Sequence, residues 1–139
     1  MKRNRRRPGT SISSRKSKAR GQQKKIARLI AEAIGIPPEK VGYGDDCLIK
    51  PKRMGEAGVD VHISEQIRKR FPIACECKNT KSLGLTDAVK QAKEYMKAGY
   101  NHWLVCYRHK QKDLIIMDVD MFFKLYSKAY PEIEKDGEI

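Results

Sequence analysis

Apolar residues recur at two different spacings along this chain, and each spacing predicts a different kind of element. Steps of three and four residues predict helices over 22–35, 83–99 and 120–130. Alternation or short apolar runs predict strands over 47–50, 59–64, 71–78, 102–108 and 113–119. The resulting order α-β-β-β-α-β-β-α fits an α/β fold, in which a central mixed β-sheet is flanked by helices.

Residues that begin or end helices support these boundaries. Gly35 ends the first predicted helix, and Gly99 is expected as the C-cap of the second. Thr86 is a candidate N-cap for that second helix. The third predicted helix carries aromatic residues that we expect on its inner side, against the sheet.

The net charge of +13 is concentrated at the N-terminus, because residues 1–25 hold eleven Lys and Arg but no Asp or Glu. The remaining residues hold nineteen basic and seventeen acidic side chains. We therefore expect a basic arm over 1–21, disordered until it binds a polyanion, then one folded domain over 22–130 and an acidic flexible tail over 131–139. Nucleic acid is the favoured polyanion, and a solubilising tail is the alternative.

Cysteine usage and hydropathy indicate the compartment. The four cysteines lie in apolar, strand-like runs and form no zinc spacing with the three histidines, so free buried thiols in a reducing cytoplasm are expected. No apolar run approaches the roughly 20 residues of a spanning helix, and no signal peptide is recognisable. We expect a protein of a phage, archaeal or bacterial cell interior with no membrane partner.

Three charged residues on adjacent predicted strands carry the candidate chemistry. Asp60 lies on the polar face of its strand, and Glu76 and Lys78 share the polar face of the next one. Two carboxylates together with a main-chain carbonyl make a hard oxygen site that suits Mg²⁺, for which Mn²⁺ can substitute. The alternative is a half-exposed ion pair on a structural strand.

The run GVD at 58–60, followed fifteen residues later by ECK at 76–78, resembles the PD-(D/E)xK nuclease pattern. Val59 stands where that pattern usually has proline, a residue without a chemical role. The order of elements from about 22 to 120 also resembles this fold. Small size, a leading helix and basic character make the chain most similar to the archaeal-type and phage Holliday junction resolvases.

This resemblance implies a restriction-endonuclease-like core and a metal-dependent active site. Asp60 and Glu76 would be catalytic carboxylates and metal ligands, the carbonyl of Cys77 a third ligand, and Lys78 the group that helps to activate water. Glu32, from the leading helix, would be a further catalytic residue and metal ligand. Because Glu32 lies off the apolar stripe of its helix, a solvated position is its alternative.

Other residues are open candidates for the same site. Glu56, Asp45 and Asp46 compete with Glu32 as the extra carboxylate. Gln91 and Tyr95 share a helix face, and the resemblance implies that Gln91 steadies the site, whereas Tyr95 is equally well a core residue. His62, on the strand face of Asp60, could bind a phosphate or be structural. The candidate DNA-binding residues are Lys50, Lys52 and Arg53 before the second predicted strand, with Arg5, Arg6 and Arg7 in the arm.

The leading functional hypothesis is a metal-dependent DNA endonuclease, selective for four-way junctions or other branched DNA. Symmetric cutting of a junction would require a homodimer, for which the segment 122–126 is a candidate surface, or else core. A nicking or DNA-end-processing nuclease of the same fold is one alternative. A non-catalytic nucleic-acid-binding protein is another, although bare carboxylates at a polyanion-binding surface weaken binding unless a metal bridges them.

Overall fold

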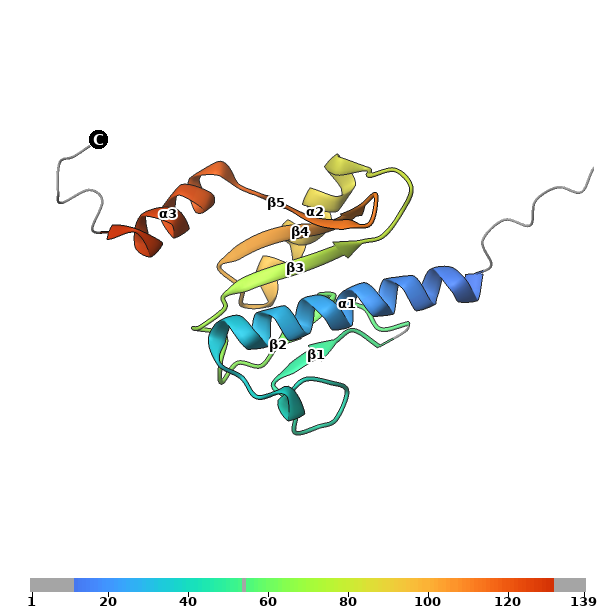
Figure 1. Ribbon diagram of the computed structural model, residues 1–139, viewed down its shortest axis with the longest axis horizontal. Coiled ribbons are helices and arrows are strands. Elements are labelled where there is room, and N and C mark those ends of the chain that lie inside the picture. The colour runs from blue at the N-terminus through green and yellow to red at the C-terminus, as the bar shows by residue number, and fades with distance from the viewer. Residues whose placement is uncertain (1–11, 54, 132–139) are drawn as a thin grey trace, which may run out of the picture.

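The computed structural model describes residues 12–53 and 55–131, in which helices cover both faces of a five-stranded sheet (Figure 1). The helices are α1 (Ile12–Ile34), α2 (Leu85–Tyr95) and α3 (Val119–Ala129), with single 3₁₀ turns η1 (Pro38–Lys40) and η2 (Met96–Ala98). The strands are β1 (Ile49–Pro51), β2 (Val61–Ile63), β3 (Ile73–Lys78), β4 (His102–His109) and β5 (Lys112–Met117). The predicted α/β class and the order of its elements are therefore confirmed.

The strands lie in the sheet in chain order, and the sheet is mixed because only β3 and β4 run parallel. A parallel pair needs a crossover connection, and α2 supplies it on the face opposite α1. Val61 lies opposite Cys75 where β2 pairs with β3, and Cys77 lies opposite Cys106 where β3 pairs with β4. This register determines which polar residues meet at the site described below.

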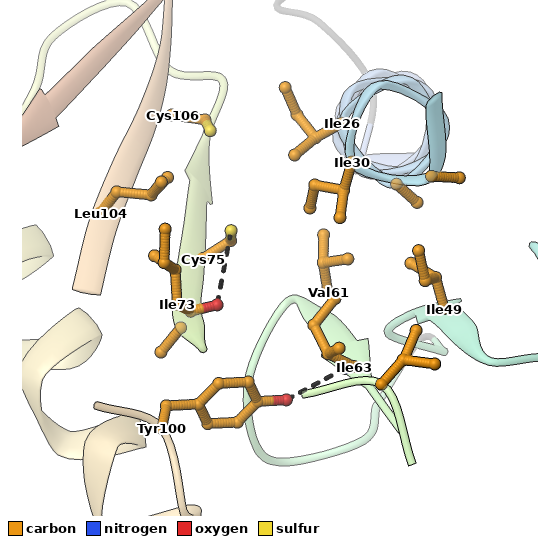
Figure 2. Packing of buried hydrophobic residues seen from close by; sticks show 14 of the residues in the cluster. Ile26, Ile30, Ile49, Val61, Ile63, Ile73, Cys75, Tyr100, Leu104 and Cys106 are labelled. Carbon is orange, nitrogen blue, oxygen red and sulfur yellow. Dashed lines mark hydrogen bonds between the residues drawn. The ribbon is translucent and has the colours of Figure 1, made fainter. Parts of the chain in front are cut away.

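The main core lies between α1 and the sheet, where the alternating strands place their apolar residues (Figure 2). Ile26 and Ile30 of α1 face Val61 and Ile63 of β2, which are fully buried. The hydroxyl of Tyr100 accepts the N–H of Ile63 at 3.0 Å and closes the lower end of this core. A smaller apolar cluster, of Ala88, Ala92 and Val105, joins α2 to the other face.

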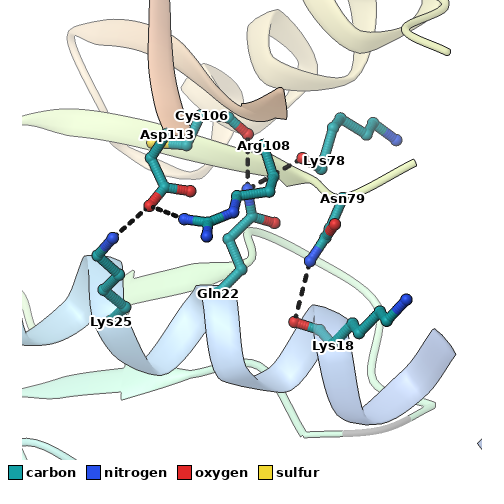
Figure 3. Close-up of polar contacts among 8 residues, drawn as sticks. All are labelled: Lys18, Gln22, Lys25, Lys78, Asn79, Cys106, Arg108 and Asp113. Carbon is teal, nitrogen blue, oxygen red and sulfur yellow. Dashed lines mark hydrogen bonds and ion pairs between the residues drawn. The ribbon is translucent and has the colours of Figure 1, made fainter. Parts of the chain in front are cut away.

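Helix α1 begins at Ile12, ten residues before its predicted start. Residues 12–21 of the predicted arm are thus helical, which corrects the expected disorder for that part, and residues 1–11 lie outside the described residues. The pattern missed this extension because residues 12–21 are mostly polar and basic. Polar contacts join this part of α1 to the sheet at Lys18 and at Gln22, the first residue of the predicted helix. Gln22 is buried and donates its amide to the carbonyls of Lys78 (2.9 Å) and Cys106 (3.3 Å), and Asn79 donates to the carbonyl of Lys18 (Figure 3).

Two expectations for helix surfaces and caps are wrong. The aromatic residues of α3 are not on an inner side, since Met121 is the one residue of this helix that is buried, and Figure 1 shows α3 projecting from the end of β5. Thr86 is not an N-cap, because α2 starts after Gly84 and has no side-chain cap. Gly99 is confirmed as the residue after the last turn, with φ of 100° in the left-handed region that favours glycine.

The expectation of free, buried thiols is confirmed for Cys75 and Cys106, while Cys47 and Cys77 are free and partly exposed. Across residues 12–53 and 55–131, no helix is both long enough and apolar enough to span a membrane.

Candidate active site

The pairing of β2 with β3 brings Asp60 and Glu76 together. Val61 lies opposite Cys75, and Asp60, the residue before β2, binds the backbone N–H of Cys77 through its carboxylate, which places it next to Glu76. Both point away from the α1 core, toward the face that carries α2, yet both are only 4% exposed. The sequence prediction that these two carboxylates converge is supported by this geometry.

The carboxylate of Asp60 is held on both of its oxygens. Oδ2 accepts the backbone N–H of Cys77 at 2.7 Å, and Oδ1 lies 3.0 Å from the ammonium nitrogen of Lys52. The backbone N–H of Lys52 also donates to the carbonyl of Asp60 at 2.8 Å, so both segments are fixed relative to each other. The Asp60 side chain therefore accepts the backbone N–H of Cys77, which in a longer strand pair would donate to a main-chain carbonyl of the neighbouring strand.

Glu76 is satisfied on one oxygen only. Oε1 lies 3.2 Å from Nζ of Lys78, whereas Oε2 is buried and, among the described residues, has no hydrogen-bond partner. Burial raises the pKa of Glu76, the negative charge of Asp60 raises it further, and the ammonium of Lys78 acts in the opposite direction. An unpaired buried carboxylate oxygen costs stability, and either the nearby phenol of Tyr95 or a bound cation could supply the missing partner.

Helix α2 adds two residues to this group. The Lys78 ammonium donates to Oε1 of Gln91 at 2.7 Å, which places it between the helix and Glu76. Tyr95, one turn after Gln91, lies beside the carboxylates. Burial raises its pKa, and the charges of Glu76 and Asp60 raise it further, so the phenol stays protonated at neutral pH. The structure thus brings Gln91 into contact with Lys78, next to Glu76.

The donor atoms at this point of the sheet fit a hard divalent cation. In an extended strand the N–H and C=O of one residue point to the same side, so the Cys77 carbonyl points to the side of Asp60, to which its N–H donates. Two carboxylates and one carbonyl are oxygen ligands, as Mg²⁺ prefers. Within the described ranges no third His, Cys, Asp or Glu joins them, so the remaining coordination positions would be filled by water or substrate.

The other predicted carboxylates lie elsewhere. Glu32 is exposed on α1, which packs on the opposite face of the sheet, so its expected role as a metal ligand is not supported. Asp46 forms an ion pair with Lys40 at 3.6 Å, and its side chain is exposed. Asp45 and Glu56 line the cavity described next rather than the space between Asp60 and Glu76.

The predicted DNA-binding residues Lys50, Lys52 and Arg53 line a cavity of about 430 Å³ beside the site. Arg68 and His62 line it too, and Lys52 belongs both to this cavity and to the ion pair with Asp60. The pKa of His62 is lowered, first by burial and then by the Arg68 and Lys50 cations. Arg5, Arg6 and Arg7 lie outside the described residues.

Sequence reasoning missed the ion pair of Lys52 and the contact of Gln22 with the end of β3. Lys52 was assigned to DNA because it follows a strand in a basic loop, and no periodicity indicates that its ammonium turns back to Asp60. Gln22 gives no signal in the sequence, because a buried glutamine within a helix looks like a surface residue.

Comparisons of the chain with protein-family models, with curated proteins and with solved structures found no match.

Proposed function

We propose that this protein is a metal-dependent DNA endonuclease with a restriction-endonuclease-like core. The observation that carries the proposal is the buried Asp60–Glu76 pair, in which Oε2 of Glu76 lacks a partner among the described residues and the Lys78 ammonium lies alongside. This arrangement adds contacts between the motif residues to the PD-(D/E)xK resemblance of the sequence.

A structural ion pair is the weaker explanation for these residues. Surface pairs contribute little to stability, and buried charged pairs are often no more stable than apolar residues of similar size. The hydrogen bond from Cys77 gives Asp60 a structural role, but a protein that needed only a stable strand would do as well with an apolar side chain in place of Glu76. Two like charges retained side by side, with raised pKa at Glu76, are typical of functional sites.

The residues of the site have separate roles in the proposed reaction. Asp60, Glu76 and the carbonyl of Cys77 would hold a divalent cation, which polarises the phosphodiester and lowers the pKa of a bound water. Lys78, fixed by Gln91, lies where an ammonium can orient the attacking water and offset negative charge that develops on phosphate. The protonated phenol of Tyr95 can donate to Glu76 or to that water.

The substrate we propose is branched DNA, above all a four-way junction, bound by a homodimer. Lys50, Lys52 and Arg53 line one cavity, which adjoins the carboxylates through the Lys52–Asp60 ion pair, and there they would contact phosphates of the bound strand. Two sites related by a two-fold axis would cut two strands of one junction symmetrically. Nicking or end-processing of linear DNA uses the same site and differs in how the substrate is selected.

The test is cleavage of labelled four-way junction, linear duplex and single-stranded DNA with Mg²⁺, Mn²⁺ or EDTA. We expect paired cuts in the junction that EDTA abolishes. Asp60→Asn and Lys78→Ala should each lower the rate by about 100-fold or more, since removal of one electrostatic contact to the transition state costs 10²–10³. Both variants should still bind DNA.

Matched controls are Asp87→Asn and Lys90→Ala, which change exposed residues of α2. These should cleave at the wild-type rate. Cleavage of linear DNA as well would move the function to a general nuclease with the same centre. Salt-sensitive DNA binding without cleavage in the presence of either metal ion would refute the nuclease activity and leave a nucleic-acid-binding protein.

A further inference from the structure

The side chain of Lys52 belongs both to the basic cavity and to the carboxylate pair. It lines the cavity, and its ammonium nitrogen lies 3.0 Å from Oδ1 of Asp60. The Lys52 side chain is 26% exposed, whereas that of Asp60 is 5% exposed. The ammonium can therefore be reached from solvent, while the carboxylate that it pairs with cannot.

The backbone at Lys52 is fixed, so a change of partner would involve its side chain alone. Its N–H donates to the carbonyl of Asp60 at 2.8 Å, and the guanidinium of Arg53 donates to the carbonyl of Tyr43 at 2.6 Å. The ammonium itself is a point charge on a flexible stem of four carbons. Side chains that reach solvent change rotamer within picoseconds to nanoseconds. The Lys52 ammonium can thus leave Asp60 for another anion while the strands keep their places.

The ion pair with Lys52 leaves the proposed metal site without net charge. Asp60 and Glu76 carry two negative charges, and Lys52 and Lys78 place two positive charges 3.0 Å and 3.2 Å from them. A divalent cation gains little from a group of charges that sum to zero, and both ammonium groups repel it. With the Lys52 ammonium elsewhere, the group carries a charge of −1 and Oδ1 of Asp60 becomes available as a ligand. The affinity for a metal ion therefore depends on the position of this ammonium.

The cavity offers the Lys52 ammonium a second anion when a phosphate enters. Its volume is about 430 Å³, and four cations line it against two carboxylates, namely Lys50, Lys52, Arg53 and Arg68 against Asp45 and Glu56. His62 adds little charge at neutral pH, because burial and the nearby cations lower its pKa. Lysine binds phosphate oxygens as well as carboxylates. A phosphate in this cavity would compete with Asp60 for Lys52.

We propose that the Lys52 ammonium moves from Asp60 to a DNA phosphate when DNA binds, and that this movement opens the carboxylate pair to the divalent cation. DNA and the metal ion then strengthen each other's binding by the same factor, because coupling between two sites is reciprocal. Lys52 stays protonated throughout, and no covalent bond changes. The inference rests on the metal site and the DNA substrate of the proposed function, but its test needs no cleavage.

The test is the affinity of the full chain for a labelled linear duplex with and without Mn²⁺, measured by fluorescence anisotropy on ice at constant ionic strength. A gel checks that the duplex stays intact. Mn²⁺ should tighten DNA binding by wild type by about 10-fold, within the usual range of such couplings. Lys52→Met should lose most of this factor, because its carboxylate pair is open without DNA. The matched control, Lys50→Met, removes a cation from the same cavity, so it should weaken DNA binding but keep the wild-type factor.

Calorimetric titration of Mn²⁺ without DNA provides the second measurement. Lys52→Met should bind Mn²⁺ about 10-fold more tightly than wild type, since the competing ammonium is gone. Circular dichroism checks that the variant is folded. If it is not, Lys52→Gln, which keeps a hydrogen-bond donor without the charge, serves in its place.

The two measurements separate this inference from the proposed function. Equal effects of Mn²⁺ on DNA affinity in wild type and a folded Lys52 variant would overturn the inference alone, and so would equal Mn²⁺ affinities without DNA. If wild type and both variants bind no Mn²⁺ with or without DNA, the metal site of the proposed function is refuted as well.

Discussion

Asp60 combines a structural and a proposed chemical role in one carboxylate. Its two oxygens hold Cys77 and Lys52, so the residue fixes β3 against the segment after β1 even without a ligand. Lys52 occupies the position of a counter-ion beside a carboxylate that is 4% exposed. A divalent cation that enters the site would compete with this ammonium for the same oxygen.

We therefore predict that Lys52→Met lowers the free energy of unfolding by about 1–3 kcal/mol, because Asp60 is left buried without a cation. Millimolar Mn²⁺ should restore most of this loss, since a ligand that binds only the folded state stabilises it. Urea unfolding with and without Mn²⁺ measures both effects. The control is Lys50→Met, which removes the lysine two residues before Lys52. Equal decreases in the free energy of unfolding for the two variants would contradict the Lys52–Asp60 ion pair.

The position of α1 depends on polar contacts as much as on its apolar stripe. Asp113 at the start of β5 accepts Arg108 at 2.9 Å and forms an ion pair with Lys25 of α1 (Figure 3). Burial alone would raise the pKa of Asp113, but these two cations lower it below its usual value. The Asp113 carboxylate thus links α1 to β5, the last strand of the sheet.

Asp113→Asn should lower the free energy of unfolding at pH 7 by roughly 1 kcal/mol. Because the folded-state pKa is the lower one, wild type holds this advantage above the unfolded-state pKa near 4 and loses it as pH falls through the folded-state value. Urea unfolding between about pH 7 and 2 should show the two proteins converging at the acid end. A difference that persists unchanged at low pH would contradict the ion pair.

How far the sequence predicts these elements depends on what stabilises each one. Alternation in β2 and β3 predicted that Asp60 and Glu76 meet, because strand pairing converts a period of two into a shared face. The extension of α1 over 12–21 could not be predicted, since this segment is polar and basic and its contact with Asn79 uses the main-chain carbonyl of Lys18. For α3 the apolar pattern was present but led to a wrong prediction, because the aromatic residues expected against the sheet are exposed. Apolar periodicity shows that a helix has an apolar face but not what packs against that face.

At the scale of the whole molecule, basic residues occur in two places, in the N-terminal segment and in the cavity next to the carboxylate pair. The 11 residues before α1 include Arg5, Arg6 and Arg7, while Lys50, Lys52 and Arg53 line the cavity next to the site. Such a distribution would favour binding of a long polyanion that reaches beyond the site. Contacts of this kind contribute affinity without reading sequence.

Replacing Arg5, Arg6 and Arg7 together by alanine should reduce the salt dependence of DNA binding. If all three neutralise phosphates of duplex DNA, the slope of log K against log salt becomes shallower by about 2.7. Fluorescence anisotropy of a labelled duplex over several NaCl concentrations gives the slope. An unchanged slope would show that these residues do not contact DNA.

The hydrogen bond from Cys77 to Asp60 makes one amide proton an internal reporter of the site. A side chain rather than a neighbouring strand accepts this proton, and that hydrogen bond should slow its exchange with solvent deuterium. Any ligand that draws the carboxylate away would release this proton and speed its exchange, while the rest of β3 stays protected. The engagement of Asp60 could thus be followed at a single backbone position, with no reaction taking place.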